Sequence, residues 1–253
     1  MAASLRTRLV PSWGLRRRRS LRLVALLACR DEMRFLPGIM ANVAPHVDGI
    51  VALDDGSSDG SAEFLAERPE LLELIRRPRE RPDWDEAGNY RALVEAALRQ
   101  GADWAISLDA DERVEREFRV RAERVIRRGE ALGLSAYAVR LRDLWDSRDR
   151  YRADGLWAGK APPRLFRLRD DHDFDDRPLH ASKVPGQAGR VPTADLLVYH
   201  LRMLTPEDRR ARRERYERLD PEARWQPREG YAYLTDETGL VLRRVPRRRG
   251  FVE

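Results

Sequence analysis

The chain has 253 residues and a formal net charge of +6, and this length suits one large domain or one domain with a small appendage. Its single cysteine, Cys29, excludes an intramolecular disulfide and a zinc site built from cysteines. No apolar run approaches the roughly 18–20 residues that cross a membrane. A hydrophobic fraction of 42% argues against a wholly disordered chain.

The positive charge lies at the two ends of the chain. Residues 1–22 hold seven arginines and no acid, and residues 243–253 hold five arginines and one glutamate, so residues 23–242 carry a net charge of −5. Lysine occurs only twice, and a codon-usage bias toward arginine would produce this pattern without any functional demand. An acidic body argues against nucleic-acid binding. We expect a cytoplasmic protein whose basic ends offer a peripheral contact with anionic lipid at the inner face of the membrane.

The first apolar run allows two interpretations. Four arginines at 16–19 precede it, and it ends in Leu-Leu-Ala-Cys, which is similar to a twin-arginine export signal with a lipobox. However, the run 23–29 is at the lower length limit for such a signal, and the charged residues 30–32 follow at once. We therefore favour a buried first strand preceded by a disordered arginine-rich arm at 1–21.

Strand and helix patterns alternate in the first half of the body. In chain order we expect a strand at 23–28, a helix at 35–44, a strand at 49–53, a helix at 62–68 with Ser61 as its N-cap, a strand at 71–76, a loop at 77–86, a helix at 89–100 and a strand at 102–108. This alternation predicts a parallel sheet with helices on both faces.

The pattern loosens after residue 115. We expect a helix at 116–128, a strand at 136–141, a mobile loop at 142–161, a strand at 164–168, a solvated acidic turn at 170–176, a strand at 196–200, a helix at 206–219, and disorder from about residue 243. Trp145, Tyr151 and Trp157 in the expected loop could stack on an acceptor or form a satellite core.

Acidic residues follow three of the expected strands, at 31–32, 54–55 and 109–111. In an open parallel sheet, ligands bind beyond the carboxyl ends of the strands. Carboxylates that converge there repel one another unless a cation or a donor-rich ligand joins them. This edge of the sheet is therefore the candidate ligand site.

Two of these acidic runs suit specific chemistry. The run 54–61, Asp-Asp-Gly-Ser-Ser-Asp-Gly-Ser, offers carboxylates to a base or a ribose, and its glycines let a ligand approach the backbone. The same composition also suits an Asx-type turn that caps a helix. The run 109–112, Asp-Ala-Asp-Glu, offers two carboxylates that suit Mg²⁺ or Mn²⁺ bound to phosphates. The alternative for this second run is a solvated acidic loop.

The stretch from about 22 to 130 resembles the nucleotide-binding half of family 2 glycosyltransferases of the GT-A fold. The matching features are the strand that runs into Arg30-Asp31-Glu32, the run 54–61, Gly88-Asn89-Tyr90-Arg91 at the start of a helix, and Asp-Trp-Ala-Ile-Ser-Leu-Asp-Ala-Asp-Glu. The resemblance extends to about residue 220 through Arg164-Leu165-Phe166-Arg167, Arg177-Pro178-Leu179-His180 and Val198-Tyr199-His200.

This resemblance implies an α/β fold of GT-A type. A Rossmann-like, mostly parallel central sheet would be flanked by helices, with a smaller C-terminal extension on the acceptor side. The domain would span 22–220, with a nucleotide-sugar-binding half at 22–112 and an acceptor half at 113–220. A C-terminal tail would follow at 221–253.

The resemblance also implies a nucleotide-diphosphate sugar donor, a divalent metal (Mn²⁺ or Mg²⁺) and inversion at the anomeric carbon. Asp109 and Asp111 would bind the metal and the diphosphate, and His200 would be a further metal ligand or a phosphate contact. The alternative for His200 is a hydrogen-bonded structural residue. The residues expected to bind the nucleotide sugar are Arg30, Glu32, Asp54, Asp55, Ser57, Asp59, Asn89, Arg91, Asp109 and Ala110.

The sequence does not single out the general base that would activate the acceptor hydroxyl. In the subgroup that the chain resembles, the histidine of the later motif is commonly followed by glutamate, whereas Ala181 follows His180. The candidate catalytic residues are Asp175, Asp176 and His180, and Asp143 and Asp146 are further carboxylates that spacing does not favour.

The sequence thus predicts a metal-dependent, inverting glycosyltransferase. Its acceptor would be a glycan, a lipid-linked molecule or a small molecule. A nucleotidyltransferase of related sheet topology is the alternative, but no glycine-rich, basic phosphate loop lies near the first strand. A basic nucleic-acid-binding protein is the third hypothesis, and it would require a basic face on the folded body.

Overall fold

The structure is a computed structural model, and it describes residues 20–79, 85–174, 182–224 and 230–253. The described elements are β1 (Leu23–Cys29), α1 (Leu36–Val43), β2 (Ile50–Asp54), α2 (Ser61–Ala66), β3 (Leu71–Arg76), α3 (Glu86–Arg99), β4 (Trp104–Asp109), β5 (Glu112–Val114), α4 (Phe118–Glu130), β6 (Ala136–Asp143), β7 (Arg150–Arg152), α5 (Gly155–Ala158), β8 (Pro163–Arg167), β9 (Thr193–His200), α6 (Pro206–Leu219) and β10 (Leu242–Arg244). Each strand and helix expected before residue 109 is present. The N-cap of α2 is Gly60 rather than the expected Ser61, and Ser61 is the first helical residue.

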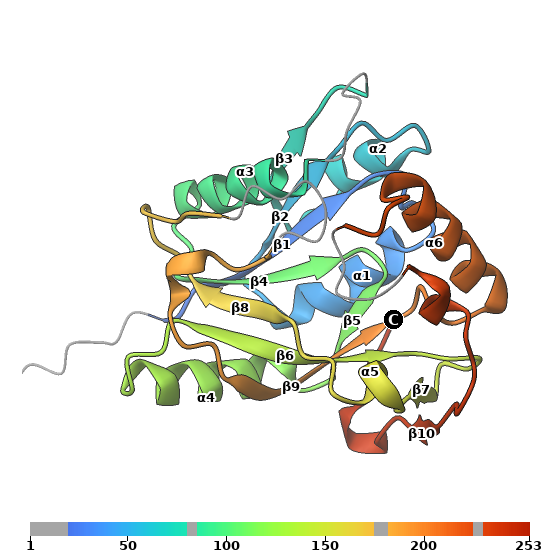
Figure 1. Ribbon diagram of the computed structural model, residues 1–253. Helices are drawn as coiled ribbons and strands as arrows, with labels where there is room; N and C mark the ends of the chain where they lie inside the picture. The colour runs from blue at the N-terminus through green and yellow to red at the C-terminus, as the bar shows by residue number, and fades with distance from the viewer. Residues whose placement is uncertain (1–19, 80–84, 175–181, 225–229) are drawn as a thin grey trace, which may run out of the picture.

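An eight-stranded sheet with the order β3-β2-β1-β4-β8-β6-β9-β5 forms the centre of the molecule (Figure 1). The strands β3, β2, β1 and β4 run parallel, as the alternating pattern predicts. The strand β8 is antiparallel to both β4 and β6, and β9 returns parallel to β6. The fold is therefore a mixed α/β architecture whose parallel half carries the acidic strand ends.

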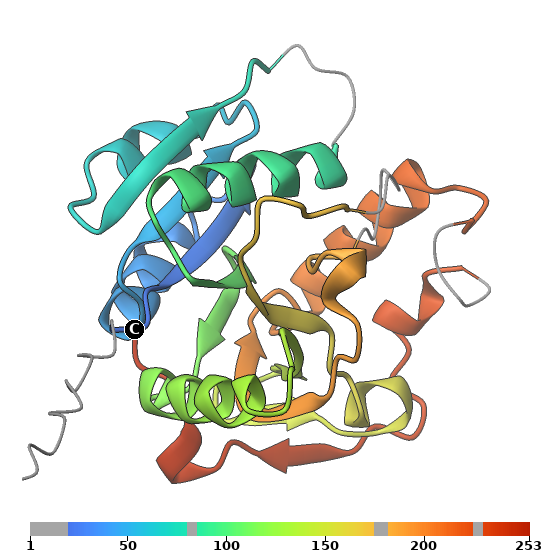
Figure 2. The same ribbon diagram turned by 90° about the vertical axis from the view of Figure 1, so that its left-hand side faces the viewer.

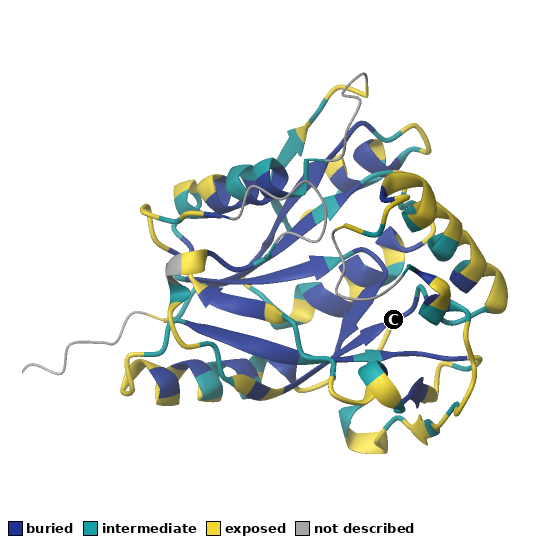
Figure 3. Cartoon of the chain, viewed as in Figure 1, coloured by how far each residue is buried: buried dark blue, intermediate teal, exposed yellow. Residues whose placement is uncertain are grey.

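The strand β1 is buried on both faces because its successive side chains pack against helices on opposite sides of the sheet. Leu23, Ala25 and Leu27 belong to the core that contains α1 and α4, whereas Val24 and Leu26 pack with α3. Figure 2 shows α3 and α1 on opposite sides of the parallel strands. Figure 3 shows the central strands of the sheet, such as β1, β2 and β4, buried and the outer surface of α6 exposed.

The segment 142–161, expected to be a mobile loop, is ordered into β7 and α5. Trp145 and Trp157 are 0% and 3% exposed, and their rings meet edge to face at 5.6 Å. They form a separate apolar cluster with Met203, Tyr231 and Leu234. The satellite-core alternative is confirmed, since both indoles are buried and neither ring is available to stack on an acceptor.

The expectation of disorder from residue 243 is wrong. The strand β10 pairs antiparallel with β7, and Arg249 donates to the buried carboxylate of Glu115 at 2.5 and 2.7 Å. The ring of Phe251 lies 5.3 Å from that of Tyr199. A buried carboxylate requires a charge partner, and the C-terminal segment supplies it. Sequence composition carries no sign of this pairing, because Glu115 and Arg249 lie far apart in the chain.

In the described ranges, no helix combines the length and the apolar composition that crossing a bilayer requires.

Candidate active site

The loop after β2 is built by two of its own aspartates. Asp54 Oδ2 accepts hydrogen bonds from the backbone N–H groups of Gly56 (3.2 Å) and Ser57 (3.0 Å). Asp59 Oδ1 accepts from both the N–H and the hydroxyl of Ser61, and its Oδ2 accepts from the N–H of Met33 at 2.9 Å. Asp54 and Asp59 therefore form the turn, in agreement with the Asx-turn alternative, and three of their oxygens are already engaged.

The same loop holds the segment that follows β1. Ser57 Oγ accepts from the N–H of Asp31 at 2.9 Å, and Ser61 Oγ accepts from the N–H of Glu32 at 3.1 Å. The backbone of Asp31 has a φ of +53°, a region that aspartate tolerates better than most residues. Its carboxylate accepts from the N–H of Ser58 at 2.7 Å. These contacts fix the direction in which Arg30 and Glu32 leave the strand.

Asp55 and Asn89 differ from the loop-forming aspartates because they have unused hydrogen-bonding atoms. Asp55 is 2% exposed, and its buried Oδ2 has no hydrogen-bond partner among the described residues; Arg30 Nη1 lies 3.9 Å away. Asn89 is 1% exposed, and neither its Oδ1 nor its Nδ2 has such a partner. Buried polar atoms without partners are costly, so both residues remain candidates to bind a ligand.

The carboxylate of Asp109 lies at the end of β4 between two cations. Lys183 Nζ pairs with its Oδ1, and Arg164 Nη2 lies 3.6 Å from its Oδ2. Desolvation alone would raise the pKa of Asp109, but these two cations outweigh it and lower the pKa to about 2. Arg164 also pairs with the buried Glu112 at 2.5 Å. Asp109 is therefore ionised at neutral pH.

Asp111 lies in a second charge cluster with His200 and Arg202. Arg202 Nε donates to Asp111 Oδ2 at 2.7 Å, and His200 Nε2 lies 3.4 Å from the same oxygen. Desolvation opposes ionisation, yet these cations hold the pKa of Asp111 well below its usual value. Asp111 Oδ1 is buried without a partner in the described structure. Arg202 Nη2 also pairs with Glu32 at 2.5 Å, so it joins the ends of β1 and β4.

Asp143 fixes the imidazole ring of His200 through the Nδ1 atom of that ring. This Nδ1 lies 2.6 Å from Asp143 Oδ1, and Lys160 Nζ donates to both oxygens of Asp143 at 3.0 Å. Burial lowers the pKa of His200, but Asp111 and Asp143 have the larger combined effect and raise it. The imidazole is therefore oriented, and its Nε2 faces Asp111 and Arg212 Nη1, the latter at 3.2 Å.

Asp109, Asp111 and Arg202 from these clusters line a cavity of about 270 Å³ at the carboxyl ends of β1 and β4, whereas His200 lies behind Asp111 and does not line it. The helix α6 closes the cavity on one side (Figure 1). The sequence-predicted residues that line it are Arg30, Glu32, Asp109, Ala110 and Asp111. Sequence reasoning missed Arg202 and the α6 residues Arg212, Arg215 and Tyr216. The helical spacing of Asp208, Arg212, Arg215 and Leu219 is the signal that could have indicated an inward face of α6.

Other predicted residues lie away from this cavity or outside the described chain. Arg91 does not line it, and its Nη2 donates to the carbonyl of Phe174 at 3.1 Å. Asp175, Asp176 and His180 lie outside the described residues. Asp143 is fully buried, so it is not placed to take a proton from an acceptor.

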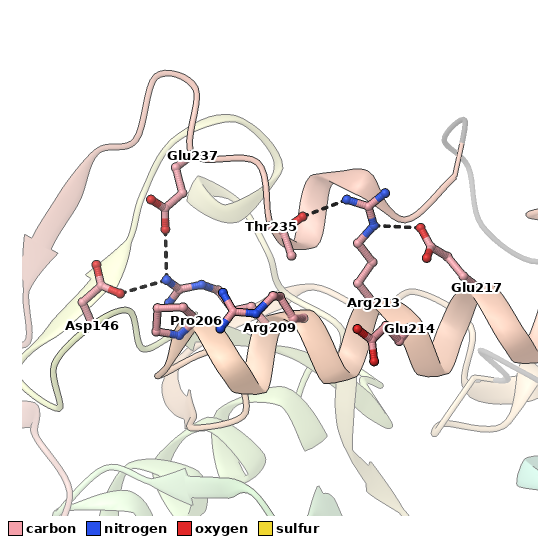
Figure 4. Close-up of a pocket in the computed structure, with 9 residues that line it drawn as sticks. Asp146, Pro206, Arg209, Arg213, Glu214, Glu217, Thr235 and Glu237 are labelled. Atoms are coloured by element: carbon pink, nitrogen blue, oxygen red, sulfur yellow. Dashed lines mark hydrogen bonds and ion pairs between the residues drawn. The ribbon is translucent and has the colours of Figure 1, made fainter.

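Asp146 lines a different cavity, of about 700 Å³, on the opposite side of α6 (Figure 4). Arg209 lies 3.0 Å from both Asp146 and Glu237, and Arg213 contacts Glu217 and Thr235. The guanidinium of Arg209 also lies 4.1 Å from the ring of Trp145. Most of the charged side chains that line this larger cavity are paired with one another by ion pairs and hydrogen bonds. Asp146 lies on this side of α6 and does not face the carboxylates that follow β1 and β4.

The donor set at this site suits a divalent metal in part. Asp111 offers an unpartnered buried oxygen, and the Asp143–His200 pair has the arrangement in which a carboxylate orients a metal-binding histidine. In contrast, Arg202 and Lys183 already neutralise Asp111 and Asp109. No cluster of three or more His, Cys, Asp or Glu side chains arranged for a metal is found among the described residues. A divalent metal would therefore have to compete with Lys183 and Arg202 for the carboxylates of Asp109 and Asp111.

Comparison with known proteins identifies relatives in sequence and in fold. No family model matches the chain. It is 26% identical over 240 residues to uncharacterised proteins of Mycobacterium tuberculosis and Mycobacterium bovis, which covers 87% of this chain and 58% of each relative. The chain thus spans less than two thirds of the length of these curated relatives.

Solved structures of S. aureus TarS share the architecture. The structure of TarS residues 1–349 aligns with a TM-score of 0.51 at 13% identity, covering 76% of this chain and 64% of that chain. A second TarS structure aligns with a TM-score of 0.50 at 12% identity, over 76% of this chain and 39% of that one. The expected fold class is confirmed: the chain has a GT-A-like α/β fold, with a large sheet flanked by helices, that these TarS structures share.

Proposed function

We propose that the protein is a glycosyltransferase that binds a nucleotide-diphosphate sugar in the cavity at the ends of β1 and β4. It would transfer the sugar to an acceptor hydroxyl with inversion at the anomeric carbon, using a divalent metal. The observation that carries the proposal is that carboxylates after β1 and β4 meet four arginines, Arg30, Arg202, Arg212 and Arg215, in a single cavity.

Arg202, Arg212 and Arg215 supply the positive charge that a diphosphate would need. Guanidinium groups match phosphate oxygens in charge and in hydrogen-bond geometry. As the sugar leaves, negative charge grows on the departing diphosphate, and cations that are already positioned stabilise that charge without reorganising. Arg202 is held by Asp111 before any ligand arrives, and Arg212 Nη1 lies 3.2 Å from Nε2 of His200.

Asp109, Asp111 and Nε2 of His200 would hold Mn²⁺ or Mg²⁺. When bound, the metal supplies further neutralisation of the leaving diphosphate. Asp143 and Lys160 would act as positioning residues, because they fix the ring of His200 through Nδ1. Asp55 and Asn89 do not line the cavity themselves, and they would contact a nucleoside that extends beyond it through the atoms that lack partners.

Thermal unfolding of the full chain with Mn²⁺ and each of UDP, GDP, CDP, ADP and TDP tests donor binding. At 100 times its dissociation constant, a ligand adds about 2.7 kcal/mol to the unfolding free energy, so one nucleoside diphosphate should raise the midpoint by several degrees. The absence of a response to all five would contradict the proposal.

A product assay separates the proposal from a nucleotidyltransferase. A glycosyltransferase releases a nucleoside diphosphate from a nucleotide sugar, whereas a nucleotidyltransferase releases pyrophosphate from a nucleoside triphosphate. Asp111→Asn should abolish sugar transfer and leave the protein folded. Glu95→Gln removes an exposed carboxylate of α3 and should retain full activity; equal activity of both variants would remove Asp111 from the mechanism.

A further inference from the structure

The C-terminal segment presents a group of exposed arginines that take no part in the candidate active site. Together with neighbours from β7 and the segment before α4, they form what we call the arginine ribbon, which consists of Arg116, Arg148, Arg150, Arg243, Arg244, Arg247 and Arg248. All seven are exposed, and none lines the cavity at the ends of β1 and β4. Any role of this surface is therefore independent of the proposed donor site.

Most arginines of the ribbon have no carboxylate or other hydrogen-bond partner among the described residues, unlike many other arginines of the protein. Except for Arg148, which pairs with Glu253, their side chains make no hydrogen bond or ion pair within the described ranges. In the same segment Arg249 is paired with Glu115 and Asp195. Arg249 thus anchors the segment to the body, while its neighbours point their charge to solvent.

Two ribbon arginines oppose each other directly. Arg244 on β10 is the cross-strand partner of Arg150 on β7. Like charges at directly opposed positions destabilise a strand pair. The two side-chain carboxylates nearby in this segment are Asp149 and Glu253, and Glu253 already pairs with Arg113 and Arg148. The ribbon therefore has excess positive charge, and an external anion would neutralise it.

Apolar side chains lie among the charges. A cavity of about 600 Å³ is lined by Arg116, Arg148 and Arg247 together with Val245, Pro246 and Phe251, and the carboxylates of Asp149 and Glu253 also line it. Val241, which immediately precedes β10, is 47% exposed. A surface that combines cations with apolar contacts suits the headgroup region of a bilayer, where phosphates and hydrocarbon lie within a few ångströms of each other.

We infer that the arginine ribbon is a docking surface for an anionic phospholipid membrane. The ribbon arginines contact headgroup phosphates, and Val241 and the apolar part of the cavity rest against the interface. A nucleic acid would supply phosphates without the apolar layer, so it is the competing polyanion to be tested.

Co-sedimentation of the full chain with vesicles tests the inference. Vesicles of phosphatidylcholine with 30% phosphatidylserine are compared with vesicles of phosphatidylcholine alone, over a salt series. The ribbon variant carries Arg150→Gln, Arg244→Gln and Arg247→Gln. The matched control carries Arg167→Gln, Arg190→Gln and Arg218→Gln, which removes the same charge from exposed arginines outside the ribbon. Both variants keep the N-terminal arginines.

Each arginine near an anionic surface contributes about 1 kcal/mol, so the ribbon variant should bind anionic vesicles about 100-fold more weakly. The affinity of the control variant for anionic vesicles should fall less than about three-fold. A ribbon variant with lysine at all three positions should retain the wild-type affinity because the charge is kept. Thermal unfolding midpoints of all variants should match that of the wild type.

Three results would overturn the inference. Equal losses in the ribbon and control variants would show that net charge alone drives binding. Equal binding of the wild type to neutral and anionic vesicles would remove the role of the arginines. Tighter ribbon-dependent binding to a short DNA duplex than to anionic vesicles at the same salt would assign the surface to nucleic acid.

Discussion

Arg202 donates from Nε to Oδ2 of Asp111 at 2.7 Å, and this contact joins the turn after β9 to the carboxylate that follows β4. The same guanidinium reaches Glu32 through Nη2. Two carboxylates from different strand ends are thus held by one cation before any ligand binds, and this explains how the acidic edge of the sheet stays folded.

Arg202→Gln should weaken both the fold and the site. It leaves Asp111 with less compensation for its buried charge, so we expect a loss of about 2 kcal/mol in the unfolding free energy. Nucleoside diphosphate affinity should fall at least about ten-fold, since one charge-assisted contact is lost. Urea unfolding and calorimetric titration measure the two effects. Arg202→Lys keeps the charge but lacks the planar guanidinium, so it should restore the unfolding free energy more fully than the affinity for the nucleoside diphosphate. If Arg202→Gln left this affinity unchanged, Arg202 would not contact the diphosphate.

Metal and nucleotide binding should be coupled. Asp109 and Asp111 are each held by protein cations, so Mn²⁺ alone should raise the unfolding midpoint only slightly. A diphosphate draws Lys183 and Arg202 toward its own charge, which frees the carboxylates for the metal. Mn²⁺ and the nucleotide together should therefore give a larger shift than the sum of their separate shifts in a fluorescence unfolding assay. Strictly additive shifts would contradict this coupling.

The Lys160–Asp143 pair predicts a defined pH dependence. Burial raises the pKa of Asp143, but Lys160 and His200 outweigh it and hold the folded pKa well below that of an ordinary aspartate. Because the folded pKa is lowered, the pair contributes stability that is fully present above about pH 4 and is lost as the pH falls below 3.8 through the folded value.

Lys160→Met takes the partly exposed ammonium away from the buried carboxylate of Asp143, and it should cost about 2 kcal/mol at pH 7. The difference from the wild type should shrink as the pH is lowered below 4, as measured by urea midpoints between pH 2 and 7. A difference that stays constant over this range would mean that the ion pair is not its source.

Arg249→Gln should detach the C-terminal segment. It removes two hydrogen bonds from the buried Glu115. Only the more distant Arg121, at 3.6 Å, then compensates the charge of this carboxylate, so the loss should be about 2 kcal/mol. Limited proteolysis should then cleave the segment after residue 240 faster than in the wild type. The neighbouring Arg248 is exposed, so Arg248→Gln is the matched control and should leave the cleavage rate unchanged.

The strands and helices before residue 109 were predictable because their signals are local. Apolar runs such as the one in β1, and the glycine and aspartate pattern after β2, act within a few residues. Besides the N-cap of α2, two expectations about whole segments were wrong, and both segments have a polar composition. Trp145 and Trp157 are buried by Met203 and Tyr231 from much later in the chain, and the C-terminal segment is ordered by Glu115.

The sequence by itself determined the alternation of strands and helices, and it placed the carboxylates of Glu32, Asp109 and Asp111 at one edge of the sheet. Only the tertiary structure decided which cations meet them. Arg202 lies 91 residues from Asp111 and 170 from Glu32, so no local pattern connects these residues. The physical reason is that secondary structure follows from short-range periodicity, whereas the partner of a buried charge depends on which distant side chain the packed fold brings within hydrogen-bond reach.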